Sequence, residues 1–198
     1  MKGNIVGYIL IILIIIICVK MYLDSDAHHL VCSISTVDGN KYCVRERKKL
    51  KEAVNLLATV TEKMKRLVKY MGEKYPDREN VKRLVKRFKP SKVSETLPTS
   101  EFTAYSENKG EKLAFCLNKN EHSNNNLIDE NTLTFVAIHE LTHIACKSTG
   151  HNDEFWYNFK FLLENAVKID IYSPVDYKKN NVNYCGMDIT DNPFYDLK

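Results

Sequence analysis

The stretch that decides the fold reads HELTH at residues 139–143 and continues as GHNDEFW at 150–156. In a helix, an H-E-x-x-H pattern places two imidazoles four residues apart on the same face. Both rings can then bind one Zn²⁺, and the Glu between them lies beside the water that the metal acidifies. A third His follows a Gly at which the chain can reverse its direction. The pattern therefore predicts a catalytic zinc site.

The helix that carries this pattern is predicted to cover Asn131–Cys146. Asp129 or Asn131 can cap its start with a side-chain oxygen. Gly150 suits the left-handed conformation of a tight reversal after a helix. The residues expected on the buried face of this helix are Leu133, Val136, Leu141, Ile144 and Ala145.

Three protein ligands and one open position are typical of a catalytic zinc ion. His139 and His143 supply two of these ligands. We expect His151 to be the third, because the reversal before it brings its imidazole back toward the metal. Glu154 and Glu164 are the rival third ligands.

Glu140 distinguishes a catalytic site from a zinc ion that only stabilises a fold. Zinc would lower the pKa of its bound water toward about 7, and Glu140 would act as the general base. The same carboxyl group would then carry the proton to the leaving amine of a peptide bond. A structural zinc site needs only its ligands, normally four, and no neighbouring carboxylic acid. The sequence thus predicts zinc-dependent peptide hydrolysis.

The pairing of HELTH with GHNDEFW resembles the WLM and SprT-like zinc metallopeptidases, and among these the small, membrane-anchored WLM-like proteins of large DNA viruses. The resemblance implies a compact α+β domain of the zincin type, with His139, His143 and His151 as zinc ligands and Glu140 as the base. Cellular members of the family are associated with the degradation of proteins crosslinked to DNA. The segments that carry the resemblance are residues 41–48, 105–117, 131–143, 150–164 and 184–186.

The N-terminus predicts a membrane anchor. Residues 5–19 form an unbroken apolar run, which continues past Lys20 to Leu23. A helix of about 19 residues is long enough to span a bilayer when Lys20 reaches the interface. A signal peptide is the alternative, but the run is long for one and ends in a poor cleavage site. We expect an anchor over residues 1–23, a linker over 24–30 and a peptidase domain over 31–198.

The sequence leaves open on which side of the membrane the domain lies. Lys2 and the free amine favour a cytosolic N-terminus with the domain translocated. The absence of an N-x-S/T sequon and the odd number of cysteines after the anchor argue the other way. Cys32 and Cys43 flank a turn and are able to form a disulfide. Cys146 is expected to be a small core residue.

The other patterns predict helices combined with short hairpins in one domain. Hairpins are expected over Val31–Val44, turning at Asp38-Gly39, and over Phe102–Ser106 with Lys112–Leu117, turning at residues 108–110. Helices are expected over Arg45–Met71, then up to Phe88 before Pro90, and over Glu154–Val167.

Several side chains near the predicted site have expected roles of their own. By resemblance, Leu113–Leu117 would offer its strand edge to the backbone of a substrate. Trp156 is expected in the core rather than in a substrate pocket. For Tyr184 the sequence leaves two roles open, a packed side chain or a hydrogen-bond donor to the developing oxyanion. His28, His29 and His122 have no further ligand-type residues in a metal-binding spacing and are expected to be ordinary histidines.

Positive charge is concentrated in residues 44–92, which hold 17 Lys and Arg against 6 Asp and Glu, although the whole chain has a net charge of only +4. A basic segment beside a membrane anchor suits anionic lipid headgroups or nucleic acid. An ordinary solvated helix face explains the same composition.

Together these patterns predict a membrane-anchored zinc endopeptidase that cuts protein or peptide substrates near its own bilayer, as a single-pass protein of a virion or host membrane. The alternative is a catalytically silent structural or binding protein of a membrane or virion that keeps the peptidase fold. Glu140 argues against this alternative, because a scaffold has no use for a general base.

Overall fold

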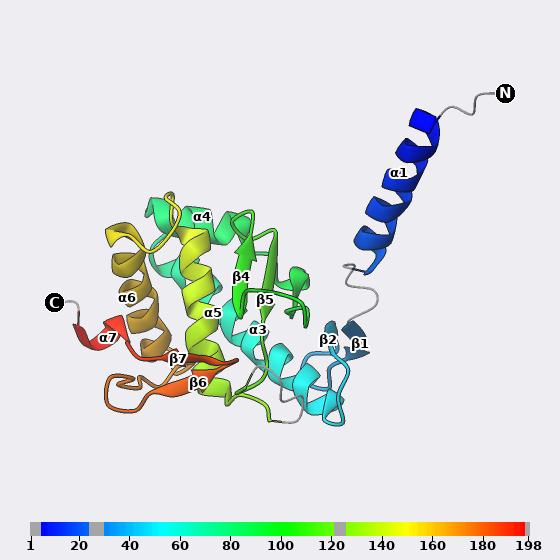
Figure 1. Cartoon of the computed structure of the whole chain (residues 1–198). Coiled ribbons are helices and arrows are strands. Elements are labelled where there is room, and N and C mark those ends of the chain that lie inside the picture. Colours follow the sequence, from blue (N-terminus) through cyan, green and yellow to red (C-terminus); the bar gives the residue numbers. More distant parts are fainter. Residues whose placement is uncertain (1–4, 24–29, 121–125, 197–198) are drawn as a thin grey trace.

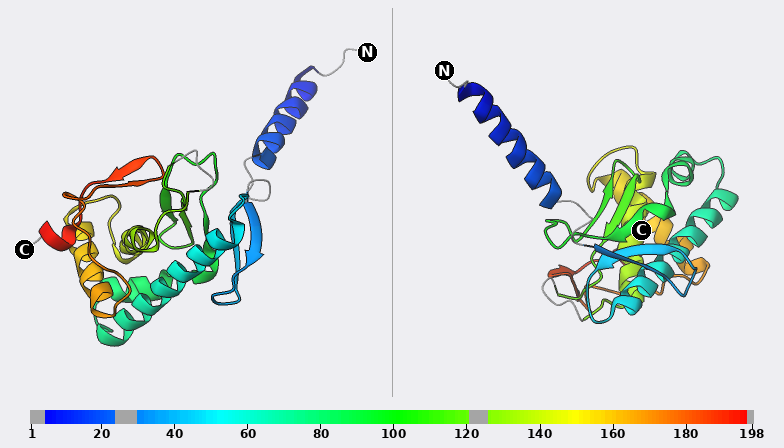
Figure 2. Two further views of the ribbon diagram at one scale, coloured as in Figure 1. Left: turned by 90° about the horizontal axis from the view of Figure 1, so that it is seen from below. Right: turned by 90° about the vertical axis from the view of Figure 1, so that its right-hand side faces the viewer.

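Helix α5 (Glu130–Ala145) lies at the centre of the fold, with α3, α4, α6 and strand β4 packed around it (Figure 1). The computed structural model describes residues 5–23, 30–120 and 126–196. Asp129 caps α5, because its carboxylate accepts a hydrogen bond of 2.9 Å from the N–H of Thr132. The view down the axis of α5 shows other elements on every side of it (Figure 2). The predicted helix is therefore confirmed.

The long basic helix, α3 (Leu50–Lys74), begins five residues later than the sequence predicts. Its apolar side chains from Val54 to Met71 form a buried face. Arg45 instead ends strand β2, where its guanidinium donates to the carbonyl and hydroxyl oxygens of Thr96 (2.8 and 2.9 Å). This tertiary contact overrides the helical pattern of the local sequence. The two further predicted helices are α4 (Glu79–Arg87) and α6 (Asp153–Lys168).

The first predicted hairpin is confirmed, but its turn is longer than expected. Strands β1 (Leu30–Ile34) and β2 (Lys41–Arg45) are antiparallel. The predicted two-residue turn is wrong, because residues 35–40 form a loop. In it the N–H of Ser35 donates to the carbonyl of Asn40 (2.9 Å), and the N–H of Gly39 donates to the carbonyl of Ser35 (3.1 Å). Cys32 lies opposite Cys43 in the ladder, and the two form a disulfide.

The second predicted hairpin belongs to a three-stranded sheet in the order β3-β5-β4. Strand β4 (Ala104–Glu107) pairs antiparallel with β5 (Lys112–Phe115), and β3 (Val93–Glu95), entered through the short 3₁₀ helix η1 (Pro90–Lys92), pairs parallel with β5. The expectation that Leu113–Leu117 offers a free edge is wrong, because β5 is hydrogen-bonded on both sides. Within the described residues, β4 is paired on one side alone and has the open edge beside α5.

A buried ion pair between Arg47 and Glu95 joins the start of the basic segment to the sheet. Both side chains are fully buried, and the N–H of Arg45 donates to the same carboxylate (2.7 Å). Arg45 and Arg47, two of the 17 basic residues in 44–92, are therefore buried and bind partners inside the protein. The contact of the remaining ones on α3 and α4 with lipid or nucleic acid stays a prediction.

The C-terminal part, for which the sequence has no clear periodicity, forms a hairpin and a short helix. Strands β6 (Val182–Tyr184) and β7 (Met187–Ile189) are antiparallel, and α7 covers Pro193–Asp196. A disulfide between Cys116 and Cys185 ties this hairpin to the end of β5. Cys146 is buried and unpaired, as predicted for a core cysteine.

Helix α1 (Ile5–Leu23) covers the apolar N-terminal run. Among the residues that the structure describes, no helix combines the length and the apolar character required to cross a membrane. The anchor over residues 1–23 stays a prediction. The linker is described only at Leu30, and His28, His29 and His122 lie outside the described residues.

Candidate active site

Three histidines meet beside α5. His139 and His143 lie one turn apart on this helix, and His151 follows the reversal at Gly150, whose φ is +77°. Their Nε2 atoms form a triangle with sides of 3.0, 3.1 and 3.2 Å. Two nitrogens bound to a tetrahedral zinc ion at 2.0–2.1 Å lie about 3.3 Å apart, so the triangle has nearly the size that zinc requires. The described residues therefore bring together the three side chains that the sequence singles out.

Burial keeps these imidazoles neutral, which is the form that binds a metal. It lowers the pKa of His139 to about 3 and that of His143 to about 4, and the neighbouring imidazoles act in the same direction. The pKa of His151, which is more exposed, is lowered by burial as well. At neutral pH the cluster is thus a set of three uncharged nitrogen donors.

Phe155 provides the surface on which the three rings rest. Its ring centroid lies 4.8, 4.5 and 4.5 Å from those of His139, His143 and His151. Trp156 follows it on α6 and donates a hydrogen bond of 3.0 Å from Nε1 to the carbonyl of His151. The core assignment of Trp156 is only partly right, because the indole packs on the core and also lines the adjacent cavity.

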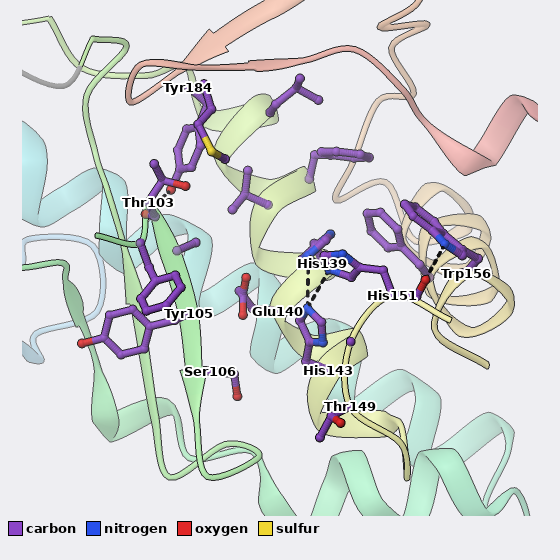
Figure 3. A pocket seen from close by; sticks show the side chains of 18 of the residues that line it. Thr103, Tyr105, Ser106, His139, Glu140, His143, Thr149, His151, Trp156 and Tyr184 are labelled. Carbon is purple, nitrogen blue, oxygen red and sulfur yellow. Dashed lines mark hydrogen bonds between the residues drawn. The ribbon is translucent and has the colours of Figure 1, made fainter. Parts of the chain in front are cut away.

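Glu140 lies on α5 between the histidine cluster and the strands of the sheet (Figure 3). Its side chain lines the cavity although the residue is 5% exposed. Burial raises the pKa of its carboxyl group to about 8. A cation bound nearby would lower this value again, because it favours the charged carboxylate. A bound cation would therefore favour the carboxylate form of Glu140, which is the form that a general base requires.

A cavity of about 880 Å³ opens beside the histidines and Glu140. One side is formed by residues 101–106, which include Ala104–Ser106 of the open-edged strand β4. The opposite side is formed by α5, α6 and the C-terminal hairpin. The large apolar side chains that line it are Phe102, Tyr105, Phe135, Val136, Trp156, Phe159, Tyr184, Met187 and Ile189. The site thus combines a polar corner with an apolar groove and a strand edge.

The rival third ligands and Tyr184 are placed differently from the histidines. Glu154 accepts hydrogen bonds from the N–H groups of Lys147 (2.8 Å) and Ser148 (3.0 Å), and so supports the loop before His151. Neither Glu154 nor Glu164 belongs to the described group of side chains that can share a metal. Tyr184 is buried, and its hydroxyl donates to the carbonyl of Thr103 (3.2 Å).

Lys109 and Arg83 are residues near the site that sequence analysis missed. Lys109 lies in the β4–β5 turn and lines the cavity, and Arg83 lies on α4. Both donate hydrogen bonds to backbone carbonyls at the end of α5. Because a carbonyl is present whatever the residue type, no pattern in the sequence reveals such partners.

Comparison with known proteins finds viral relatives, and no family model matches the chain. An uncharacterized protein of Acanthamoeba polyphaga mimivirus is 27% identical over 161 residues, which cover 79% of this chain and 81% of the relative. Uncharacterized proteins of Invertebrate iridescent virus 6 and Invertebrate iridescent virus 3 are 32% identical over 74 residues and 42% identical over 60 residues. These matches cover 37% and 30% of this chain, and 40% and 36% of the relatives.

Among solved structures, Wss1 from Saccharomyces cerevisiae is similar with a TM-score of 0.47 and 18% sequence identity. The match covers 63% of this chain and 84% of Wss1.

Proposed function

We propose that this protein is a zinc-dependent metallopeptidase in which His139, His143 and His151 hold the metal and Glu140 is the general base. The observation that carries the proposal is the convergence of three Nε2 atoms within 3.2 Å of one another, with Glu140 on the same helix at the edge of a cavity. Three neutral nitrogen donors suit zinc, and they leave its fourth position for water, as catalytic sites do. When bound, zinc would supply a water of lowered pKa and polarise a carbonyl group.

The residues of the chain itself would manage the proton and the substrate. Glu140, with its raised pKa, would take a proton from the attacking water and deliver it to the leaving amine. A substrate in extended conformation would add as a strand to the open edge of β4, which runs along the cavity wall. Its apolar side chains would enter the groove between Phe135 and Ile189. These features favour peptide substrates over small molecules.

We further propose that α1 tethers the enzyme to a membrane. Its apolar side chains are exposed, from 49% at Ile17 to 69% at Met21. A helix that is apolar around its whole circumference requires an apolar environment. The full chain should therefore remain in the membrane fraction after alkaline extraction, and deletion of residues 1–23 should release it. An unchanged distribution after the deletion would refute the tether.

The experiment that tests the proposed activity measures zinc content and cleavage of an unfolded protein by the full chain. Glu140→Gln should keep one zinc per chain and lose about 10²- to 10⁴-fold in rate, because it removes the general base. Glu164→Gln, on α6 outside the cluster, is the matched control and should behave as the wild type.

Each departure from this result has a distinct meaning. Full activity in Glu140→Gln would refute the assigned base. Zinc without cleavage in the wild type would favour the scaffold alternative. A folded wild-type chain that takes up no zinc would refute the proposal itself.

A further inference from the structure

The segment of residues 146–150, between α5 and α6, decides where the third histidine lies. His139 and His143 are fixed relative to each other by their common helix. His151 comes within 3.0 and 3.1 Å of them only because of the path that this segment takes. Any group that fixes the segment therefore also fixes the third nitrogen.

Lys109 holds the carbonyl groups of this segment. Its Nζ donates to the carbonyl oxygens of three successive residues, which are Cys146 (3.1 Å), Lys147 (3.4 Å) and Ser148. These carbonyls directly follow the last turn of α5, where a cation also meets the negative end of the helix dipole. One ammonium group thus binds three consecutive carbonyl oxygens and stabilises the reversal of the chain.

The backbone of the β4–β5 turn places Lys109 for this role. Lys109 has φ of +58°, and the next residue, Gly110, has φ of +107°. A Cβ atom at Gly110 would lie 2.8 Å from the carbonyl oxygen of Arg87, so the turn sits directly against the end of α4. The ammonium group therefore reaches the segment from a turn that α4 holds in place.

Glu154 and Arg83 also hold the segment. Glu154 accepts the N–H groups of Lys147 and Ser148. Arg83 donates from Nε to the carbonyl of Ala145 (2.7 Å) and lies 3.4 Å from the Glu154 carboxylate. The carbonyls and the amides of the segment are thus bound by opposite charges on different elements.

We propose that Lys109 is a positioning residue of the metal centre, which holds His151 in the ligand triangle by fixing residues 146–148. This inference rests on the proposed function, because it takes the three histidines as metal ligands. If Lys109 acted only through its charge, the effect would have the opposite sign. An ammonium group repels a divalent cation, so its removal would strengthen metal binding. The sign of the change in affinity therefore separates positioning from simple electrostatics.

The test measures Co²⁺ binding by the full chain in detergent, from its visible absorption bands, and Zn²⁺ binding by competition. Lys109→Met should weaken Co²⁺ binding roughly ten-fold, as loss of a group that orients a ligand does, and should shift the bands toward those of His151→Ala. Lys109→Arg, which keeps N–H donors, should recover part of the affinity. Lys86→Met, an exposed lysine on α4, is the matched control and should retain wild-type binding.

Glu154→Gln supplies a second variant, whose affinity is compared with that of Lys109→Met. If Lys109→Met does not fold, Lys109→Gln, which also removes the positive charge, takes its place. Because the two residues carry opposite charges, a purely electrostatic effect would move the two affinities in opposite directions, whereas loosening of the segment lowers both. Unchanged or tighter binding in Lys109→Met, or wild-type binding in Glu154→Gln, would overturn the inference and leave the metal site intact. A wild-type chain that binds neither metal would instead refute the proposed function, and this inference with it.

Discussion

Removal of the disulfide between Cys116 and Cys185 should destabilise the protein more than removal of the one between Cys32 and Cys43. The two disulfides join residues 69 and 11 positions apart. If each acts by restricting the unfolded chain, these separations correspond to about 4 and about 3 kcal/mol at 25 °C. For a domain of this size, about 4 kcal/mol lowers the Tm by roughly 8 to 16 °C. Removal of the disulfide between Cys116 and Cys185 should also release the hairpin β6–β7, which forms part of one wall of the cavity.

The assay is urea unfolding of the full chain, with and without reductant. The two variants are Cys116→Ala/Cys185→Ala and Cys32→Ala/Cys43→Ala, and the buried, unpaired Cys146 is kept in both. Reductant should lower the stability of the wild type by more than either double substitution alone, since it opens both disulfides. Equal losses in the two variants, or a wild type that does not respond to reductant, would refute the reasoning.

Two further predictions concern the loop before His151 and the turn that carries Lys109. Hydrogen bonds from Ser148 and from the backbone lower the pKa of Glu154 from 4.5 to about 2, so its carboxylate stabilises the fold above pH 4.5 and this contribution is lost as the pH falls toward 2. Between pH 5 and pH 2, the free energy of unfolding of metal-free Glu154→Gln should therefore fall less than that of the wild type. The expected difference is about 1 kcal/mol, because the Glu154 side chain is a third exposed. Parallel pH profiles of the two proteins in urea titrations would contradict this. Gly110→Ala should cost more than about 2 kcal/mol, because its Cβ would meet a backbone carbonyl at 2.8 Å, whereas Gly39→Ala, with φ of +71° and open space around it, should cost about 1 kcal/mol. Equal unfolding free energies for the two glycine variants would show that the close contact is unimportant.

Local patterns in the sequence predicted the helices well and the sheet only in part. Helix α5 and the buried face of α3 follow from apolar spacing and from the cap at Asp129. Strand β3 was missed because it has three residues and pairs in parallel with a strand about 20 positions later. That pairing makes β5 an inner strand, and it moves the open edge to β4. Register between distant short strands leaves no periodic trace in a sequence.

The candidate site was predictable where spacing alone defines it. His139 and His143 follow from helical geometry, and His151 from the glycine that precedes it. The packing of Phe155 against the three imidazoles was not predicted. An aromatic residue on α6 has the same sequence pattern whether it packs on other core residues or on imidazoles. Lys109 was hidden because a lysine in a turn is most often solvated. The pairing of Cys116 with Cys185 depended on the same unseen arrangement of strands.

If the three histidines bind a metal as proposed, their division between two segments would link metal supply to the opening of the domain. Two of them need only the local formation of α5, whereas His151 also needs α6 to dock. A metal held by all three therefore favours the docked state over partly open states that retain two ligands. At a free metal concentration 100 times the dissociation constant, this linkage would add at most about 2.7 kcal/mol to the docked state, because the two ligands of the open states still bind the metal weakly. Metal scarcity would then raise the fraction of chains with α6 detached, and with it their susceptibility to proteolysis.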